Sequence, residues 1–426
     1  MIDRTCFLRS ALLAAVLAAT AAGPAAAAEP GQTIINSDYG SLTVAAILQG
    51  YFVARIDGSE LDRTGDGVID DRDDAFANNH YDFSVDRVRL ILKGNLLSPN
   101  LTYVFQGDAK LAEFVLDARM GYVIPEDEGI STTISAGRFL PPFTLILPRL
   151  VSRLEVINYP LYLFSTYGPG APALQPFAFP GTIGRQVGVN ITQRLTPMFQ
   201  LDVGVFNGFQ RVIQAGGWGD DNDPKDFFVR AQVKPLDGLL LAVDYWLGFP
   251  VSLDRAVADD PATPANEAHA AAPFAISATD PTYQNDTAHF FVFEAELTAI
   301  ENLHLLGEFV YTRQTLRTQD FGGANPAETD IEALGGWFHV GWTFDDLFGA
   351  GADLELVARF DMLDPDIDQA DNQMMRFTFG PQFFLEGLHS QVRVNYLLNL
   401  SQTPSTPATD FDDIRHELWV QVAVEI

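Results

Sequence analysis

Oxygen-bearing side chains recur at regular intervals in an early segment of this 426-residue sequence. From Asp62 to Asp73 they follow the offsets 1, 3, 5, 7, 9 and 12 of a calcium-binding loop, with Gly67 at the sharp-turn position. Oxygen ligands at those offsets wrap around a hard divalent cation. The spacing therefore predicts a structural calcium site whose ligands are Asp62, Thr64, Asp66, Val68 (through its carbonyl), Asp70 and Asp73. The alternative is an acidic, solvated turn without an ion.

Motifs for enzymatic chemistry are absent from the sequence. It has no G-x-S-x-G elbow, no H-E-x-x-H, no phosphate-binding P-loop and no G-x-G-x-x-G. The single cysteine, Cys6, lies in the N-terminal segment, so the rest of the chain has no thiolate nucleophile and no disulfide. We therefore expect a protein that is not an enzyme and that requires no cofactor, with a structural calcium ion in the first extracellular loop as the one candidate ligand of this kind.

Apolar and polar residues alternate strictly in segments of about ten residues, which is typical of β-strands with two different faces. In Gln391–Leu400, for example, valine, tyrosine and leucine occupy one face, and glutamine, arginine and asparagine occupy most of the other. The same alternation is found in six further segments: Arg87–Lys93, Phe114–Tyr122, Phe228–Lys234, Phe290–Thr298, Asp353–Met362 and Arg415–Ile426.

Two architectures produce such strands: a soluble sandwich and a membrane barrel with a wet lumen. Charges within the polar faces favour the barrel, as do connections that alternate between short and long. Bulky aromatics at strand ends suit an interfacial girdle: Tyr51, Phe52, Tyr245, Trp246, Trp337, Phe338, Trp342 and Tyr396. The sequence therefore predicts an all-β fold, a transmembrane antiparallel β-barrel of about 16 strands. The soluble sandwich remains the alternative.

The N-terminus and the net charge indicate the compartment. Residues 1–28 combine a basic start, an alanine- and leucine-rich core and a small-residue cleavage site, as a secretory signal peptide does. We expect residues 29–42 to form a short periplasmic segment and residues 43–426 to form the barrel. The net charge of −30 argues against nucleic acid as a partner. The expected location is the outer membrane, in contact with lipid.

Charged residues of both signs fall on the faces that would line the lumen. Four arginines could pass an anion from site to site, because guanidinium matches phosphate and carboxylate geometry: Arg87, Arg89, Arg119 and Arg393. Carboxylates line the same interior by the same alternation: Asp117, Asp244, Glu294, Glu296, Glu308, Asp353, Glu355 and Asp361. The alternation alone leaves the charge selectivity of the lumen open.

The segment Tyr81–Gln210 resembles the phosphate-selective porin O and P family of bacterial outer-membrane channels. The resemblance is carried by VDRVRLILKGNL (85–96), LDARMGY (116–122), ISAGRFLPPF (134–143), GRQVGVNI (184–191) and LDVGVFNG (201–208), in this order. It implies a sixteen-stranded homotrimeric porin whose third long loop folds into the pore.

In this sequence that loop would be Thr144–Pro180, which is rich in proline and aromatic residues and poor in charge. An ordinary external loop is the alternative. Within the loop, Arg149, Arg153 and Glu155 are the candidates for a constriction, although Arg153 and Glu155 could instead tie the loop to the barrel wall.

The predicted function is a passive diffusion channel for small hydrophilic solutes or ions, with a preference for anions or phosphate as an open question. Two alternatives share the same strands: a surface-binding or adhesive barrel with a plugged lumen, and an outer-membrane hydrolase with a Ser–His pair in its wall.

Overall fold

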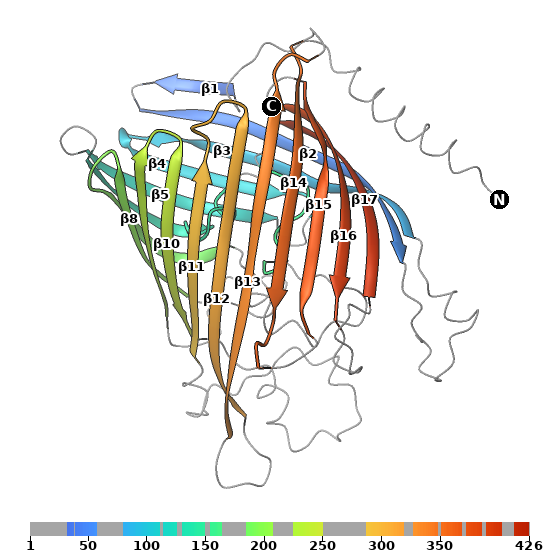
Figure 1. Cartoon of the computed structure of the whole chain (residues 1–426). Helices are drawn as coiled ribbons and strands as arrows, with labels where there is room; N and C mark the ends of the chain where they lie inside the picture. Colours follow the sequence, from blue (N-terminus) through green and yellow to red (C-terminus); the bar gives the residue numbers. More distant parts are fainter. Residues whose placement is uncertain are drawn as a thin grey trace, which may run out of the picture.

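The computed structural model of the chain describes residues 32–37, 39–57, 80–110, 114–125, 130–149, 154–163, 185–207, 225–249, 287–318, 327–347, 351–368, 372–385, 389–402 and 413–425. These residues form an antiparallel sheet of 17 strands, shown in Figure 1. Within these ranges, no helix is long and apolar enough to cross a bilayer.

The strands follow one another in chain order. Their bounds are β1 Gln32–Ser37, β2 Gly40–Asp57, β3 His80–Leu96, β4 Ser98–Asp108, β5 Val115–Pro125, β6 Ser131–Phe139, β7 Gln186–Arg194, β8 Phe199–Phe206, β9 Asp226–Leu236, β10 Leu239–Gly248, β11 Thr287–Leu297, β12 Leu303–Thr318, β13 Ala327–Phe344, β14 Asp353–Asp364, β15 Met374–Phe384, β16 Ser390–Ser401 and β17 Asp413–Glu425.

The sheet closes on itself because β17 pairs with β2. Each strand from β2 to β17 also pairs with its neighbours in the chain, so that sixteen strands form a closed ring. Closure leaves no open edge in the wall of the barrel. The predicted barrel of about 16 antiparallel strands is confirmed.

Strand β1 lies outside this ring and pairs with β2 at one end of the barrel. It pairs with the first residues of β2, where Gln32 faces Val44 and Ser37 faces Gly40. The last pair between β17 and β2 joins Glu425 to Ile47, so β1 supplies backbone partners to the start of β2 beyond the end of β17. Residues Gln32–Ser37 of the expected periplasmic segment, 29–42, therefore form a strand.

The two faces of the strands differ as the alternation predicts. In β16 the side chains of Gln391, Arg393 and Asn395 are buried, whereas those of Val392 and Val394 are partly exposed. Large apolar side chains lie on the outer surface, among them Phe293, Phe338 and Phe379, each at least half exposed. An outer surface this apolar suits a lipid environment better than water.

Two of the tryptophans assigned to the girdle point into the barrel instead. Trp246 and Trp337 are almost completely buried, and their indole nitrogens donate to carboxylates, Trp246 to Asp226 (2.8 Å) and Trp337 to Glu308 (2.6 Å). A buried indole N–H needs an acceptor, and the acidic inner wall provides one. Trp342 is 43% exposed, as expected for a girdle residue.

The chain between β6 and β7 enters the barrel. Its described parts, residues 140–149 and 154–163, are called the inserted loop below. They lie inside the ring of strands (Figure 1) and contact inward side chains of β10, β12, β14, β15 and β16. For its described residues, the prediction that this loop folds into the barrel is confirmed.

Candidate functional site

The inserted loop is attached to the inner wall by buried carboxylates. The backbone N–H of Thr144 donates to Asp244 on β10 (2.6 Å). Glu308 on β12 accepts hydrogen bonds from the backbone N–H groups of Leu145 and Ile146 and from the hydroxyl of Tyr162. Because these backbone groups belong to a loop without its own ladder, side chains of the wall must satisfy them. Glu308 is the main attachment point.

A second set of hydrogen bonds holds the far end of the inserted loop. Asn395 on β16 accepts from the backbone N–H of Ile157 (2.9 Å), and Arg359 on β14 donates to the carbonyl of Asn158 (2.7 Å). Arg376 on β15 donates to the carbonyl of Tyr159. The loop is thus fixed to both sides of the lumen rather than at its two ends alone.

An apolar core lies between the inserted loop and one side of the wall. It joins loop residues with inward residues of β6 and of every strand from β8 to β15: Phe139, Phe143, Leu145, Ile146, Leu147, Leu154, Leu161, Tyr162, Leu163, Phe206, Phe228, Trp246, Ala288, Phe290, Val292, Leu306, Val310, Trp337, Leu363 and Met374. The ring of Trp246 lies 5.4 Å from those of both Phe143 and Phe206. Apolar side chains of the loop and the wall thus pack together on this side of the lumen.

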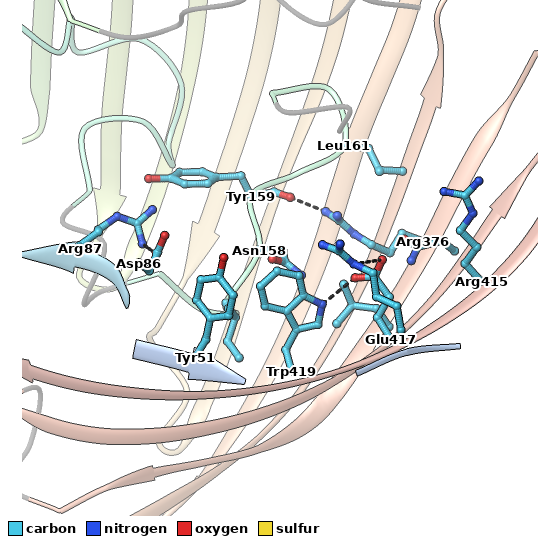
Figure 2. Close-up of a pocket in the computed structure, with 14 residues that line it drawn as sticks. Tyr51, Asp86, Arg87, Asn158, Tyr159, Leu161, Arg376, Arg415, Glu417 and Trp419 are labelled. Carbon is cyan, nitrogen blue, oxygen red and sulfur yellow. Dashed lines mark hydrogen bonds and ion pairs between the residues drawn. The ribbon is translucent and has the colours of Figure 1, made fainter. Parts of the chain in front are cut away.

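The opposite side of the lumen contains a cavity of about 310 Å³ (Figure 2). We call it the lumen cavity. It lies between the inserted loop and strands β2, β3 and β15–β17, and its lining residues are Tyr51, Arg55, Asp86, Arg87, Ile157, Asn158, Tyr159, Leu161, Arg376, Leu397, Asn399, Arg415, Glu417 and Trp419. Four of them are arginines and two are acids, so the lining carries an excess of positive charge.

Several arginines of the lumen cavity are held in place by neighbours. Arg55 lies 3.4 Å from Glu417 and 5.7 Å from the centre of the Trp419 ring. Arg87 pairs with Asp86 and donates to Gln49 (2.9 Å). These contacts restrict the rotation of the two guanidinium groups in the lumen cavity.

The arginines predicted to form a ladder are distributed around the barrel, and of these four only Arg87 lines the lumen cavity. Arg89 is paired with Asp108 (3.0 Å) on β4. Arg119 lies over the ring of Phe139 (5.5 Å to its centre). Arg393 is 2% exposed and contacts Gln421 (3.4 Å).

Arg149 and Glu155 lie together in the inserted loop. Arg149 pairs with Glu155 and with Glu296 of β11 (2.7 Å), so it connects two parts of the loop to the wall. Burial lowers the pKa of Arg149, but the charges of Glu155 and Glu296 outweigh burial and raise it above its ordinary value. Arg149 therefore keeps its charge as a tie between loop and wall.

Three predictions concern residues outside the described ranges. These are the constriction role of Arg153, the calcium ligands of Asp62–Asp73, and the signal peptide of residues 1–28. All three stay predictions.

Sequence reasoning did not select Arg376 and Trp419 as residues of the lumen cavity. It assigned Tyr51 to the interfacial girdle, whereas Tyr51 lines the lumen cavity. The alternation in β17 does place Arg415, Glu417 and Trp419 on the polar face, but a single strand cannot show which polar residues meet across the lumen. That information depends on where the inserted loop fills the barrel.

No family model matches the chain, and no curated protein matches its sequence. Solved structures are similar in fold. The anion-selective porin from Comamonas acidovorans is 13% identical, with a TM-score of 0.55 and coverage of 91% of this chain and 100% of that chain. The OmpF complex with daunomycin from Salmonella typhi is 12% identical (TM-score 0.51; 93% and 100%). The outer membrane channel DcaP of Acinetobacter baumannii is 11% identical (TM-score 0.50; 93% and 100%). The chain thus has the fold of outer-membrane porin barrels.

Proposed function

We propose that this protein is a passive diffusion channel of the outer membrane for small hydrophilic solutes, with a preference for anions. The observation that carries the proposal is the division of the lumen. The inserted loop and its apolar core fill the side of β8–β15, and the arginine-rich lumen cavity occupies the other side. The packed side would limit the width of the passage. The polar side would provide a wet path that is lined by charged side chains.

The exterior of the barrel supports a location in a bilayer. Its apolar side chains are exposed from β2 around to β17, including Leu48, Val243, Phe309 and Phe377. A closed barrel with an apolar outer face satisfies all backbone hydrogen bonds without water, which a membrane-spanning structure requires.

The charge of the lumen cavity supports the preference for anions. Its arginines outnumber its carboxylates four to two, and guanidinium groups bind phosphate and carboxylate through paired N–H donors. Tyrosine and tryptophan side chains beside the arginines narrow the passage without adding negative charge. The structure from Comamonas acidovorans carries the name of an anion-selective porin, which agrees with this preference.

Phosphate as the permeant ion and a homotrimeric assembly are implied by the resemblance to the phosphate-selective family, and both stay part of the proposal. Competition of phosphate with chloride current tests the first. Chemical cross-linking of the protein in native outer membranes tests the second, with a trimer band as the expected result.

The preference for anions is tested by removing three arginines that line the lumen cavity from strands β2, β3 and β17. The variant Arg55→Gln, Arg87→Gln, Arg415→Gln should shift the reversal potential in a salt gradient toward the value for cations, because the lining then carries more negative than positive charge. Arg313→Gln is the matched control, since Arg313 is half exposed and pairs with Asp330 outside the cavity. An unchanged reversal potential in the triple variant contradicts the anion preference.

A further inference from the structure

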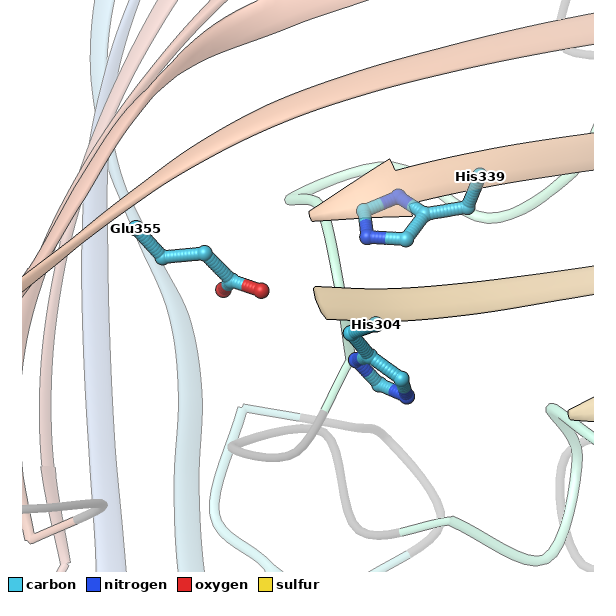
Figure 3. Close-up of side chains that lie close together, drawn as sticks. All are labelled: His304, His339 and Glu355. Atoms are coloured by element: carbon cyan, nitrogen blue, oxygen red, sulfur yellow. The ribbon is translucent and has the colours of Figure 1, made fainter. Parts of the chain in front are cut away.

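Three side chains with metal-binding chemistry meet on the inner wall, outside the lumen cavity. They are His304 on β12, His339 on β13 and Glu355 on β14, and Figure 3 shows them around one space. One ligand atom of each residue lies within 4.8 Å of the others. In a tetrahedral site with bonds of about 2.1 Å, ligand atoms lie roughly 3.4 Å apart, so small side-chain rotations would bring them to bonding distance.

His339 points to a ligand that the protein itself does not supply. Its side chain is completely buried, and neither ring nitrogen has a hydrogen-bond partner. Three other histidines on the strands do have partners: His289 bonds to Tyr245, His416 to Tyr396 and His304 to Glu296. A buried imidazole without a partner is unusual, and a metal ion would satisfy the lone pair of its unprotonated nitrogen.

Gly341 leaves room for the cluster. It lies two residues after His339 on the same face of β13 and pairs with His304. A Cβ atom at this position would collide with the carboxylate of Glu355 and lie 3.2 Å from Nε2 of His339. Any larger residue would therefore displace Glu355 from the space that it shares with the histidine.

The surroundings of His304 match the second layer of a metal site. Nε2 of His304 lies 3.2 Å from Glu296. A carboxylate at this distance favours the tautomer with a proton on Nε2 and leaves the lone pair of Nδ1 available, as at many metal-bound histidines. Glu296 is itself held by Arg149 of the inserted loop (2.7 Å). The His304 side chain is 26% exposed, which provides a route by which an ion could enter.

We propose that His304, His339 and Glu355 bind one divalent transition-metal ion, for which Zn²⁺ is the reference. Two imidazoles and one carboxylate select zinc and its neighbours among the first-row metals over calcium and magnesium, which prefer all-oxygen sites. Three protein ligands leave a fourth position open to water. The ion would join three strands of the wall and, through Glu296, lie next to the attachment of the inserted loop. This site is independent of the proposed channel function.

The test uses the complete barrel, purified in detergent without a histidine tag and freed of metal with a chelator. Zn²⁺ binding is measured by titration calorimetry, and the coordination geometry by the visible spectrum of the Co²⁺ form. We expect one tight site per chain and an intense, tetrahedral Co²⁺ spectrum. His339→Ala, His304→Ala and Glu355→Gln should each weaken Zn²⁺ binding at least about 100-fold, and Glu296→Gln about 10-fold.

His289→Ala and His416→Ala are the matched controls, because each removes an imidazole that bonds to a tyrosine elsewhere on the wall. Both should retain wild-type affinity. The folded state of every variant is checked by its heat-dependent migration in SDS gels. A triple variant, His304→Ala, His339→Ala, Glu355→Gln, removes all three ligands. The proposal is overturned if the wild-type protein gives no tetrahedral Co²⁺ spectrum, or if it binds Zn²⁺ no more tightly than this triple variant. The Co²⁺ spectrum depends on the wild-type protein alone, so this result is obtained even if every variant fails to fold.

Discussion

At the scale of single residues, Glu308 contributes most to the position of the inserted loop. Its carboxylate accepts from two backbone N–H groups and the Tyr162 hydroxyl of the loop, and from the indole of Trp337 (2.6 Å) in the wall. A buried carboxylate with several donors is costly to remove, because each donor then loses its acceptor.

Glu308→Ala is therefore expected to lower the free energy of unfolding by about 3 kcal/mol or more. It should also raise the single-channel conductance, since the loop would no longer be fixed against β12. Guanidinium unfolding and bilayer recordings measure the two effects. Glu301→Ala, in an exposed turn, is the control and should change neither. A Glu308→Ala channel with wild-type conductance would mean that the loop does not depend on this carboxylate.

Tyr162 gives the attachment a predictable dependence on pH. Burial raises the pKa of its hydroxyl well above the ordinary value, and Glu308 raises it further. The folded protein then holds this proton at a pH at which the unfolded chain has lost it. The contribution of Tyr162 to the free energy of unfolding is therefore fully present below about pH 10, and it declines as the pH rises above that value.

The free energy of unfolding should therefore fall as the pH rises above about 10, and it should fall less in Tyr162→Phe. Unfolding at a series of pH values measures this difference. Tyr39→Phe, at a side chain 79% exposed, serves as the control. Identical pH profiles for wild type and Tyr162→Phe would contradict a raised pKa of Tyr162 as the cause of the pH dependence.

Some of these residues could be identified in the sequence and others could not. The alternation within β3 and β16 correctly indicates that Arg87 and Arg393 face inward. It cannot indicate that Arg393 is enclosed while Arg87 lines a cavity, because that difference depends on the inserted loop, more than 50 residues away along the chain from either one. The grouping of His304, His339 and Glu355 requires the register of three strands, which spacing alone does not provide.

At the scale of elements, β11 alternates clearly only in its second half, where Glu294 and Glu296 share one face. Its first half, Phe290–Phe293, is apolar on both faces, so the sequence there does not show which face points inward. In the structure Phe290 and Val292 are completely buried against the inserted loop, whereas Phe293 is 53% exposed on the outside. Two apolar faces mark a strand that contacts a packed lumen on one side and an apolar environment on the other.

The difference in burial between Phe290 and Phe293 predicts effects of different size for the same substitution at the two positions. Phe290→Ala should lower the free energy of unfolding by about 3 kcal/mol or more, because it leaves a void in the core of the lumen. Phe293→Ala should change it by less than about 1 kcal/mol in detergent, since its side chain faces outward. Guanidinium unfolding measures the free energy of unfolding of both variants. Similar losses for the two would mean that Phe290 does not pack against the loop.

The connection between β2 and β3 carries the predicted calcium ligands. If Asp62, Asp66 and Asp73 hold an ion, removing calcium with a chelator should speed protease cleavage between residues 58 and 79. Added Ca²⁺ should restore protection, and Asp66→Asn should be cleaved quickly with or without the ion. Cleavage that is indifferent to calcium would leave an ordinary acidic turn.

At the scale of the whole molecule, the closed barrel could be predicted because its determinants are local. Each strand carries its own alternation, and the alternating connection lengths fix how the strands follow one another. The extra strand β1 could not be predicted, since QTIINS lacks a clear two-faced pattern and forms only against the start of β2. The division of the lumen into a packed half and an open half arises from contacts distant in sequence.

We propose above that the barrel conducts through the side of the lumen that holds the lumen cavity. Planar-bilayer recording of the purified wild-type barrel measures this conduction. Stable current steps, with a reversal potential in a salt gradient that favours anions, are the predicted result. A barrel that inserts into the bilayer in its folded form and yet passes no current would contradict the channel proposal.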